Sequence, residues 1–200
     1  KEEKKRLVVA TGNVNKLREI AEIFPHYEVI SAKQAGFEGE VEETGETFAE
    51  NSRLKAEAVA RALGCIALAD DSGLCAEALG GAPGVYSARF GGEGLDDTGR
   101  YRLLLQMMHG QADRRAHFHT TITCAFPNGD ILQNDGDVEG TIAFAPMGEN
   151  GFGYDPVFFV PDKRKTFAQL SAEEKAEISH RGKALRAFKE TLKNYLAEHQ

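Results

Sequence analysis

Apolar residues recur along the chain with two different periods, and each change of period marks a predicted element. The run Leu7–Ala10 is short, apolar and rich in β-branched residues, which predicts a buried strand. Apolar positions then recur every three or four residues over Asn15–Phe24, which predicts a helix that Pro25 ends. Alternation over Tyr27–Ser31 predicts a second strand. A strand, a helix and a strand in this order imply two parallel strands in one sheet.

The next part of the chain is predicted to be a loop, a long helix and a strand. Phe37–Glu46 is acidic, contains glycine and has no period, so we expect a surface loop. Thr47–Glu50 has the spacing of a capping box and opens an alanine-rich helix to about Leu63, where Gly64 ends it. The apolar run Ile66–Ala69 predicts another buried strand.

The second half of the chain adds helices at Thr98–Met108 and after Ser171, and strong period-two alternation at Ala116–Phe126. Asn128 and Gly129 form a favoured hairpin turn, so the strand starting at Ile131 should return antiparallel to its neighbour. Helices and strands together predict an α/β fold with a mixed sheet.

Composition narrows the class of protein. With 200 residues, 42% apolar and 28% charged, the chain suits one globular domain, 1–200, or one domain with two lobes around a cleft. The net charge of -7 argues against a nucleic-acid-binding protein, and no apolar run is long enough for a membrane span. The charged lead-in 1–6 lacks the apolar core of a secretory signal, and three unpaired-looking cysteines suit a reducing compartment, so we expect a cytoplasmic protein.

The first candidate for chemistry is an acidic pair directly after the strand predicted at Ile66–Ala69. If that strand is buried, Asp70 and Asp71 lie at its exit, followed by Ser72. Adjacent carboxylates repel each other unless a positive charge neutralises them, and a hard divalent cation such as Mg²⁺ is the usual partner. One acid could hold the metal while the other accepts a proton. The alternative is a solvated turn, because Asp, Ser and Gly are ordinary turn residues.

The second candidate is the segment Thr11–Lys16, which joins the first strand to the first helix. Gly12 permits a tight turn, backbone N–H groups and the helix dipole point at the loop, and Lys16 adds a positive charge. These features suit a phosphate group. The segment has a single glycine and is not a P-loop, and an ordinary capped helix with a solvated lysine is an equal alternative.

Three further segments carry polar residues that could complete a site. Glu42 and Glu43 precede a helix, where acids are also favoured by the helix dipole. Phe152, flanked by glycines in Gly151–Pro156, could stack on a flat ring or belong to the core. The cluster Ser179–Gly182 lies between two predicted helices, with Lys175 one turn earlier, and suits a polar ligand. His117 and His119 share a strand face without a third ligand, so we interpret them as polar surface.

Taken together, these motifs resemble one family. T-G-N-x-x-K, E-T-x-x-E-N, A-D-D-S-G-L, L-G-G-A-P-G-V-Y-S-A-R, G-F-G-Y-D-P and S-H-R-G occur here in the order found in inosine triphosphate pyrophosphatases, which act on non-standard purine nucleoside triphosphates of the dITP/XTP type. The resemblance runs from about Leu7 to the C-terminal helix. It implies a long mixed sheet with helices on both faces, two lobes around a central cleft, and a homodimer.

The resemblance also implies roles for individual residues. Asp71 would be the general base and a Mg²⁺ ligand, supported by Asp70 and by Glu42 or Glu43. The other implied residues would all contact the substrate, in the phosphate loop, the base pocket and the helix junction: Thr11, Gly12, Asn13, Val14, Asn15, Lys16, Ser72, Phe152, Gly153, Tyr154, Asp155, Lys175, His180 and Arg181. Phe152 would stack on the purine, and His180 and Arg181 would read its 6-oxo edge.

The expected reaction is attack of water on the α-phosphorus, which releases pyrophosphate and a nucleoside monophosphate. Donors that expect the 6-oxo group would face the 6-amino donor of ATP, and each such mismatch costs about 1 to 3 kcal/mol. Two other hypotheses remain. A nucleotide sensor would not need a general base, and a phosphatase would release orthophosphate instead.

Overall fold

The computed structural model describes residues 4–199, and these form two compact units, each built from separate parts of the chain. Among the described residues, unit 1 comprises 4–71, Thr120–Asp135 and 182–199. Unit 2 comprises Ser72–His119 and Gly136–Arg181. Residues 1–3 of the predicted charged lead-in lie outside the described residues, while Lys5 and Arg6 already belong to the first strand.

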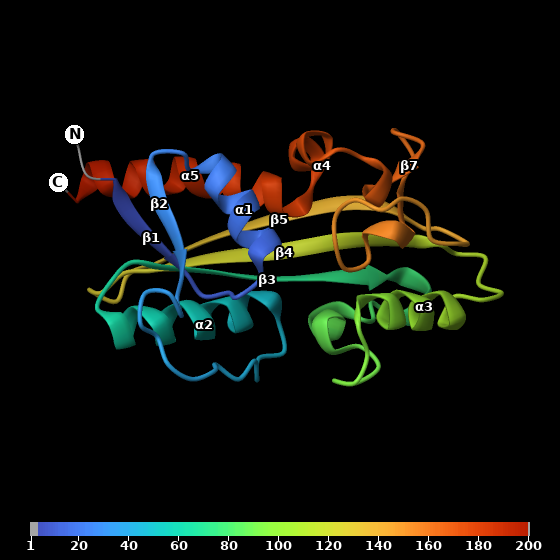
Figure 1. The fold of residues 1–200 in the computed structure, drawn as a ribbon, viewed down its shortest axis with the longest axis horizontal. Coiled ribbons are helices and arrows are strands. Elements are labelled where there is room, and N and C mark those ends of the chain that lie inside the picture. The colour runs from blue at the N-terminus through green and yellow to red at the C-terminus, as the bar shows by residue number, and fades with distance from the viewer. Residues whose placement is uncertain (1–3, 200) are drawn as a thin grey trace. The chain divides into compact units, whose positions relative to one another are not determined.

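The elements follow one another as Figure 1 labels them. The strands are β1 (Lys5–Val9), β2 (Tyr27–Ser31), β3 (Ala67–Ala76), β4 (Arg115–Ala125), β5 (Ile131–Ile142), β6 (Phe158–Val160) and β7 (Lys165–Thr166). The α-helices are α1 (Val14–Ile23), α2 (Phe48–Leu63), α3 (Asp97–Met107), α4 (Ala172–Ile178) and α5 (His180–Glu198). Four short 3₁₀ segments complete the order: η1 (Glu77–Leu79), η2 (Gly84–Arg89), η3 (Asp155–Val157) and η4 (Phe167–Gln169).

The strands form a seven-stranded mixed sheet in the order β2-β1-β3-β4-β5-β6-β7. In unit 1, β1 pairs in parallel with β2, Leu7 opposite Val29, and with β3, Val8 opposite Ala67. In unit 2, β6 pairs antiparallel with its neighbours β5 and β7. The predicted α/β class and the parallel β-α-β opening are therefore confirmed.

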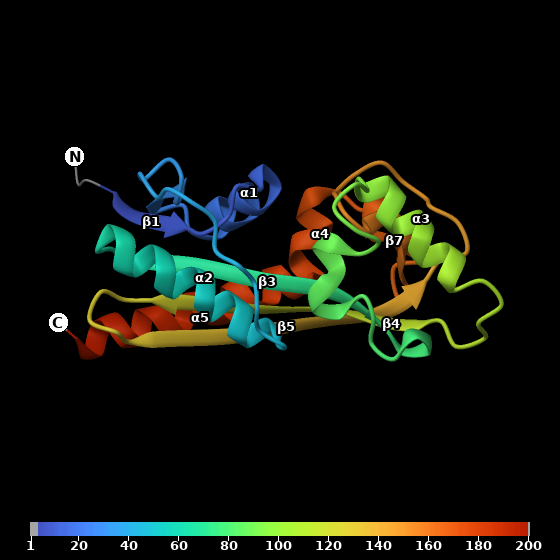
Figure 2. The same cartoon turned by 90° about the horizontal axis from the view of Figure 1, so that it is seen from below.

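Helices cover both faces of the strands in unit 1, and the alternation of side chains along β1 explains why. Leu7 and Val9 point into a core shared with α1 and α5, whereas Val8 points into a second core shared with α2. Strands buried on both faces read as continuous apolar runs, which is the pattern that predicted β1. Figures 1 and 2 show α2 on one face and α5 on the other.

Unit 2 has a core of its own, in which aromatic residues dominate. Phe118 of β4, Phe158 of β6 and Phe167 of η4 pack with Leu104 and Met108 of the α3 region. The rings of Phe118 and Phe158 are 4.5 Å apart between centroids. This core supports the chain segments that carry Phe152 and Lys175.

Local sequence signals predicted most helix and strand ends to within one or two residues of their observed positions. Thr47 caps α2 by accepting the Glu50 N–H, and Gly64 ends the helix in the left-handed conformation at φ 61°. The predicted strand Ile66–Ala69 was too short. β3 continues to Ala76, so Asp70 and Asp71 lie within a strand and not at its exit. No helix among residues 4–199 combines the length and apolar character needed to cross a membrane.

Candidate active site

The predicted phosphate loop lies at the end of β1 and leads into α1. Asn13 is the N-cap of α1, and its side-chain oxygen accepts the N–H groups of Asn15 and Lys16, at 2.9 and 3.3 Å. The Asn13 N–H in turn donates to Thr11 Oγ1 at 3.1 Å. We predicted backbone N–H groups pointing at a ligand, but these three are bonded within the loop. A phosphate would have to be held by other groups or displace these bonds.

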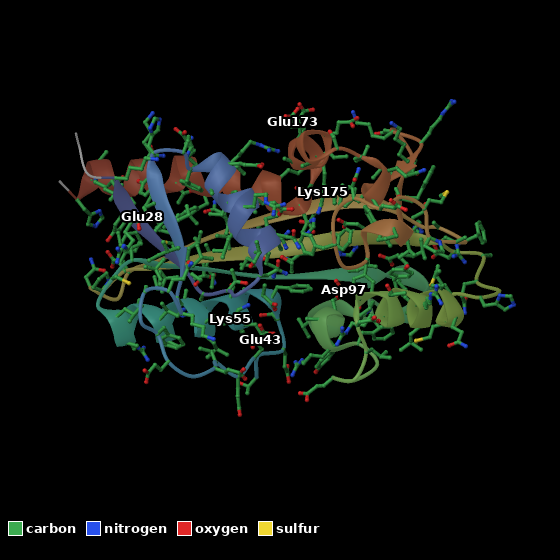
Figure 3. The ribbon with its side chains drawn as sticks, viewed as in Figure 1. Glu28, Glu43, Lys55, Asp97, Glu173 and Lys175 are labelled. Carbon is green, nitrogen blue, oxygen red and sulfur yellow. The ribbon has the colours of Figure 1, made fainter. Side chains whose placement is uncertain are left out.

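Beside this loop, unit 1 gathers a charged cluster that we name the carboxylate cluster: Lys16, Glu43, Lys55, Asp70 and Asp71. Lys16 Nζ lies 3.4 Å from Asp70 Oδ2, which joins α1 to β3. Lys55 Nζ lies 2.9 Å from Glu43 Oε1 and donates to the Asp70 carbonyl at 2.6 Å. Figure 3 shows Lys55 and Glu43 side by side. The predicted convergence of the phosphate loop and the acidic pair is therefore present in unit 1.

Asp71 has an altered acidity. It is 6% exposed, and burial raises its pKa from 3.8 to about 6. Lys55 opposes that rise, whereas the charge of Glu43 adds to it. The Asn51 amide donates to Asp71 Oδ2 at 3.2 Å, which favours the ionised form and fixes the orientation of the carboxylate. A carboxylate with a pKa near neutrality can exchange a proton at physiological pH.

Unit 2 gathers a second polar cluster, centred on Asp155. Its carboxylate forms a buried ion pair with Lys175 Nζ at 2.8 Å, and the two side chains are 5% and 8% exposed. The same Oδ2 accepts the Phe152 N–H at 3.0 Å. Gly151 lies against this oxygen with φ 73°, and a Cβ there would collide with it, so only glycine fits. Asp155 therefore fixes both the loop and the lysine.

The Phe152 ring is flanked by cations. Lys175 Nζ lies 4.5 Å and the Arg181 guanidinium 5.6 Å from its centroid, both within the range of cation–π attraction. Arg181 also donates to Ser72 Oγ at 3.2 Å. The half-buried Phe152 is thus held among charged groups and not in the apolar core. We name Ser72, Phe152, Asp155, Lys175 and Arg181 the aromatic–cation cluster.

Two residues predicted to contact the substrate have structural bonds in unit 2. The Tyr154 hydroxyl donates to the Ser87 carbonyl at 2.6 Å, and burial raises the pKa of this phenol. Ser87 Oγ in turn accepts the Leu74 N–H at 2.9 Å. The Gly153 N–H donates to Asp97 at 3.3 Å. These bonds tie the loop that carries Phe152 to η2, β3 and the first turn of α3.

Comparison with known proteins places the chain in a family. Residues 7–191 match the model of the Ham1 family. The chain belongs to the Ham1 family. A dITP/XTP pyrophosphatase of Desulforamulus reducens is 50% identical over 98% of this chain and 98% of its own length. One of Bacillus cereus is 48% identical over 96% of each. The solved Ham1 protein of Staphylococcus aureus superposes with a TM-score of 0.86, at 44% identity, over 96% of this chain and 100% of its own.

Within this Ham1 chain, the sequence did not single out Lys55 of the carboxylate cluster, nor Asn51, which donates to Asp71. Asn51 appeared only as a letter in a motif, and Lys55 did not appear at all. They are four residues apart in α2, which places both on the same side of the helix. Arg53, Glu57 and Arg61 repeat the same spacing, so the sequence pattern alone does not single the two residues out. The structure also distinguishes Glu43 from Glu42. Glu43 is half-buried and paired with Lys55, whereas Glu42 is exposed.

Metal ligands were predicted among the acids. Among residues 4–199, no three His, Cys, Asp or Glu side chains are grouped closely enough to hold a metal ion by themselves. His119 instead bonds Asp137 at 2.7 Å. Mg²⁺ usually takes only one or two carboxylates from a protein and completes its shell with water and phosphate oxygens. One or two of the carboxylates of Glu43, Asp70 and Asp71 would meet that requirement.

Proposed function

We propose that this chain hydrolyses non-standard purine nucleoside triphosphates, such as dITP, XTP and ITP, to the nucleoside monophosphate and pyrophosphate. One observation carries the proposal. Relatives named dITP/XTP pyrophosphatases are 48% to 50% identical over nearly the whole chain. The carboxylate cluster and the aromatic–cation cluster supply chemistry that this reaction needs. The activity would remove these nucleotides from the pool before they are incorporated into DNA or RNA.

Asp71 is the proposed general base. A water oxygen attacks the α-phosphorus, its proton passes to the Asp71 carboxylate, and the bond from the α-phosphorus to the bridging oxygen breaks, leaving the electron pair on pyrophosphate. The pKa of about 6 supports this role, because the group is mostly ionised at neutral pH yet basic enough to accept a proton. Asn51 keeps the carboxylate oriented toward the water.

Mg²⁺ is the proposed cofactor, with one or two of the carboxylates of Glu43, Asp70 and Asp71 as its protein ligands. Of the two glutamates, Glu43 is preferred to the exposed Glu42 because it is half-buried beside Lys55. When bound, Mg²⁺ would neutralise the triphosphate and polarise the phosphorus. Two features of the cluster support the fit. Its carboxylates outnumber its lysines, and Lys55 already forms an ion pair with Glu43 and a hydrogen bond to the Asp70 carbonyl, which indicates a site that attracts cations.

The phosphate loop Thr11–Lys16 is proposed to bind the triphosphate, chiefly through the Lys16 ammonium, which is 20% exposed. Because three N–H groups of the loop are bonded to Asn13 and Thr11, binding through the backbone would require the loop to rearrange. Positive charge at this end of the substrate stabilises the pyrophosphate as it leaves.

Unit 2 is proposed to recognise the purine. Phe152 stacks on the base, and His180 and Arg181 donate to the 6-oxo oxygen. Arg181 is 3% exposed and bonded to Ser72, so its guanidinium is held in place before a ligand arrives. An adenine would present an amino donor to these donors, and each unsatisfied buried donor costs about 1 to 3 kcal/mol. Tyr154 and Gly153 act as supports of this pocket, through Ser87 and Asp97.

We further propose a cytoplasmic homodimer, formed from single two-lobed domains. The support for the homodimer is the family resemblance. The charge of -7 bears only on other partners, because it suits neither nucleic acid nor an anionic membrane. Size-exclusion chromatography with light scattering measures the assembly directly, and a monomer at micromolar concentration would contradict it.

The decisive experiment measures the inorganic product from ITP, dITP, XTP, GTP and ATP, with and without Mg²⁺. We expect pyrophosphate from the first three only when Mg²⁺ is present, and at least about a hundredfold lower kcat/KM for ATP. Orthophosphate as the product would replace the proposal by a phosphatase. Tight binding without turnover would favour a sensor, and equal turnover of ATP would contradict the proposed base recognition.

A further inference from the structure

His180 lies in a stack of aromatic rings inside unit 2. Its imidazole is parallel to the Phe118 ring, with 4.7 Å between centroids and 12° between planes. The Phe167 ring also stacks on the Phe118 ring, with 9° between the planes and 5.6 Å between the centroids. Phe118 is 6% exposed and His180 4%, so solvent hardly reaches either ring. Three parallel rings in a closed space leave the imidazole little freedom to tilt.

The position of His180 in the chain makes such a support necessary. His180 is the first residue of α5, directly after Ser179 at the end of α4, so the backbone there is a junction between two helices. The second side-chain torsion of histidine is broad and is not set by the backbone. The direction of a ring N–H therefore depends on what packs against the face of the ring, and Phe118 supplies that face from β4.

We propose that Phe118 is a positioning residue for base selection. It holds the plane of His180 so that a ring N–H meets an acceptor at C6 of the purine, and it thereby contributes to the preference for a 6-oxo over a 6-amino base. This inference rests on the proposed function. Phe118 itself does not touch the substrate in this role, and the sequence alone showed it only as one apolar position of an alternating strand.

A neighbouring residue provides a matched control. Phe158 is as large and as buried as Phe118, at 0% exposed, and it belongs to the same core. Its ring is tilted by 54° on Phe118 and packs edge-on to Phe167 at 62°, so it fills the core instead of extending the parallel stack. Phe118→Leu and Phe158→Leu remove similar apolar volume, and only the first removes the ring parallel to His180.

The test compares kcat/KM for dITP and dATP in the wild type and both leucine variants. We expect Phe118→Leu to lower the value for dITP about tenfold and to leave dATP unchanged, the effect of one displaced buried hydrogen bond. The dITP/dATP ratio of Phe158→Leu should stay within about twofold of the wild type, even if both variants are less stable. Circular dichroism checks folding, and Phe118→Met, which keeps the volume without the ring, replaces a leucine variant that does not fold.

A double-variant cycle tests whether the effect passes through His180. In the His180→Ala background, Phe118→Leu should not change the ratio further. An unchanged ratio in Phe118→Leu, an equal fall in Phe158→Leu, or additive effects with His180→Ala would overturn the inference.

Equilibrium binding of dIMP and dAMP separates this inference from the proposed function, because binding does not require turnover. If the wild type released no pyrophosphate but Phe118→Leu still lost its preference for dIMP, the proposed reaction would fail and the role of Phe118 would stand. If the wild type hydrolysed dITP but showed no preference between dIMP and dAMP that Phe118→Leu reduces, the role of Phe118 would fail alone.

Discussion

The two clusters differ in the sign of their net charge: acidic groups are in excess in unit 1, and basic groups in unit 2. In the carboxylate cluster of unit 1, Glu43, Asp70 and Asp71 outnumber Lys16 and Lys55. In the aromatic–cation cluster of unit 2, Lys175 and Arg181 outnumber Asp155. This difference agrees with the proposed function, in which unit 1 binds a metal cation and unit 2 an electron-rich group of the base. A metal-bound nucleotide with a 6-oxo base offers one of each.

The clusters also differ in how their buried charges are compensated. Burial raises the pKa of Asp71, which indicates a carboxylate whose charge is incompletely compensated in the free protein. In unit 2 the ion pair of Asp155 with Lys175 is buried, and a loop, a glycine and an aromatic ring are fixed around it. We conclude that unit 1 is suited to changing its charge and unit 2 to keeping its shape.

The largest effect should come from removing the charge of Asp71. Asp71→Asn keeps the shape of the side chain but cannot accept a proton, so we expect kcat for dITP to fall by about 10³-fold, or about 4 kcal/mol in barrier. The measurement is pyrophosphate release at saturating Mg²⁺ and substrate. A turnover within tenfold of the wild type would show that another group accepts the proton.

The second effect should concern stability, and should come from unit 2. Lys175→Met leaves the Asp155 carboxylate buried without its ion-pair partner, which should lower the free energy of unfolding by about 3 kcal/mol. Urea denaturation of the ligand-free protein measures it. The double variant Asp155→Asn/Lys175→Met removes the remaining charge and should recover a large part of the loss. A single variant as stable as the wild type would mean that this pair contributes little.

How far the sequence predicted these clusters depends on the kind of signal. Period and capping residues are local, so α1, α2 and β2 were located within a residue or two. The end of β3 was missed because Asp70-Asp71-Ser72-Gly73 has the composition of a turn, while the structure keeps these residues in a buried strand. Local propensity cannot show that neighbouring elements will surround a polar stretch.

The candidate residues show the same division. The sequence motifs included nearly all residues of both clusters, but they did not show which residues those side chains contact. Lys55 is recognisable only when Glu43 and Asp70 are brought next to α2, and the choice between Glu43 and Glu42 depends on the path of an irregular loop. The free N–H groups predicted for the phosphate loop were wrong for Asn15 and Lys16, because the Asn13 side chain caps them.

The third effect follows from the pKa of Asp71. The folded value of about 6 exceeds the ordinary 3.8, so the proton on Asp71 stabilises the folded state fully below about pH 3.8, and this contribution is lost as the pH rises through 6. Two pKa units correspond to about 3 kcal/mol at most, and partial solvation reduces our expectation to about 2. Asp71→Asn stays neutral, so without metal it should become more stable than the wild type as the pH increases.

Urea denaturation in EDTA at about pH 4.5 and pH 7.5 measures this difference for the wild type and Asp71→Asn. Added Mg²⁺ should reduce the advantage of the variant at the higher pH, because only the wild-type carboxylate gains a cation. A difference between the two proteins that does not change with pH would show that Asp71 titrates near its ordinary value.

The smallest effect should come from a charge on the same helix that lies outside the carboxylate cluster. Arg53 and Glu57 form an ion pair in α2 at 2.8 Å, but their side chains are 57% and 23% exposed, whereas that of Lys55 is 14% exposed. Water screens the exposed pair, so Arg53→Met should change stability by less than about 0.5 kcal/mol and leave turnover unchanged. Lys55→Met, two residues away, should cost at least about 1 kcal/mol and lower turnover, because Glu43 and the Asp70 carbonyl lose a buried donor. If the two variants lost equal stability and turnover, burial within the carboxylate cluster would not determine which charged residues of unit 1 contribute to stability and activity.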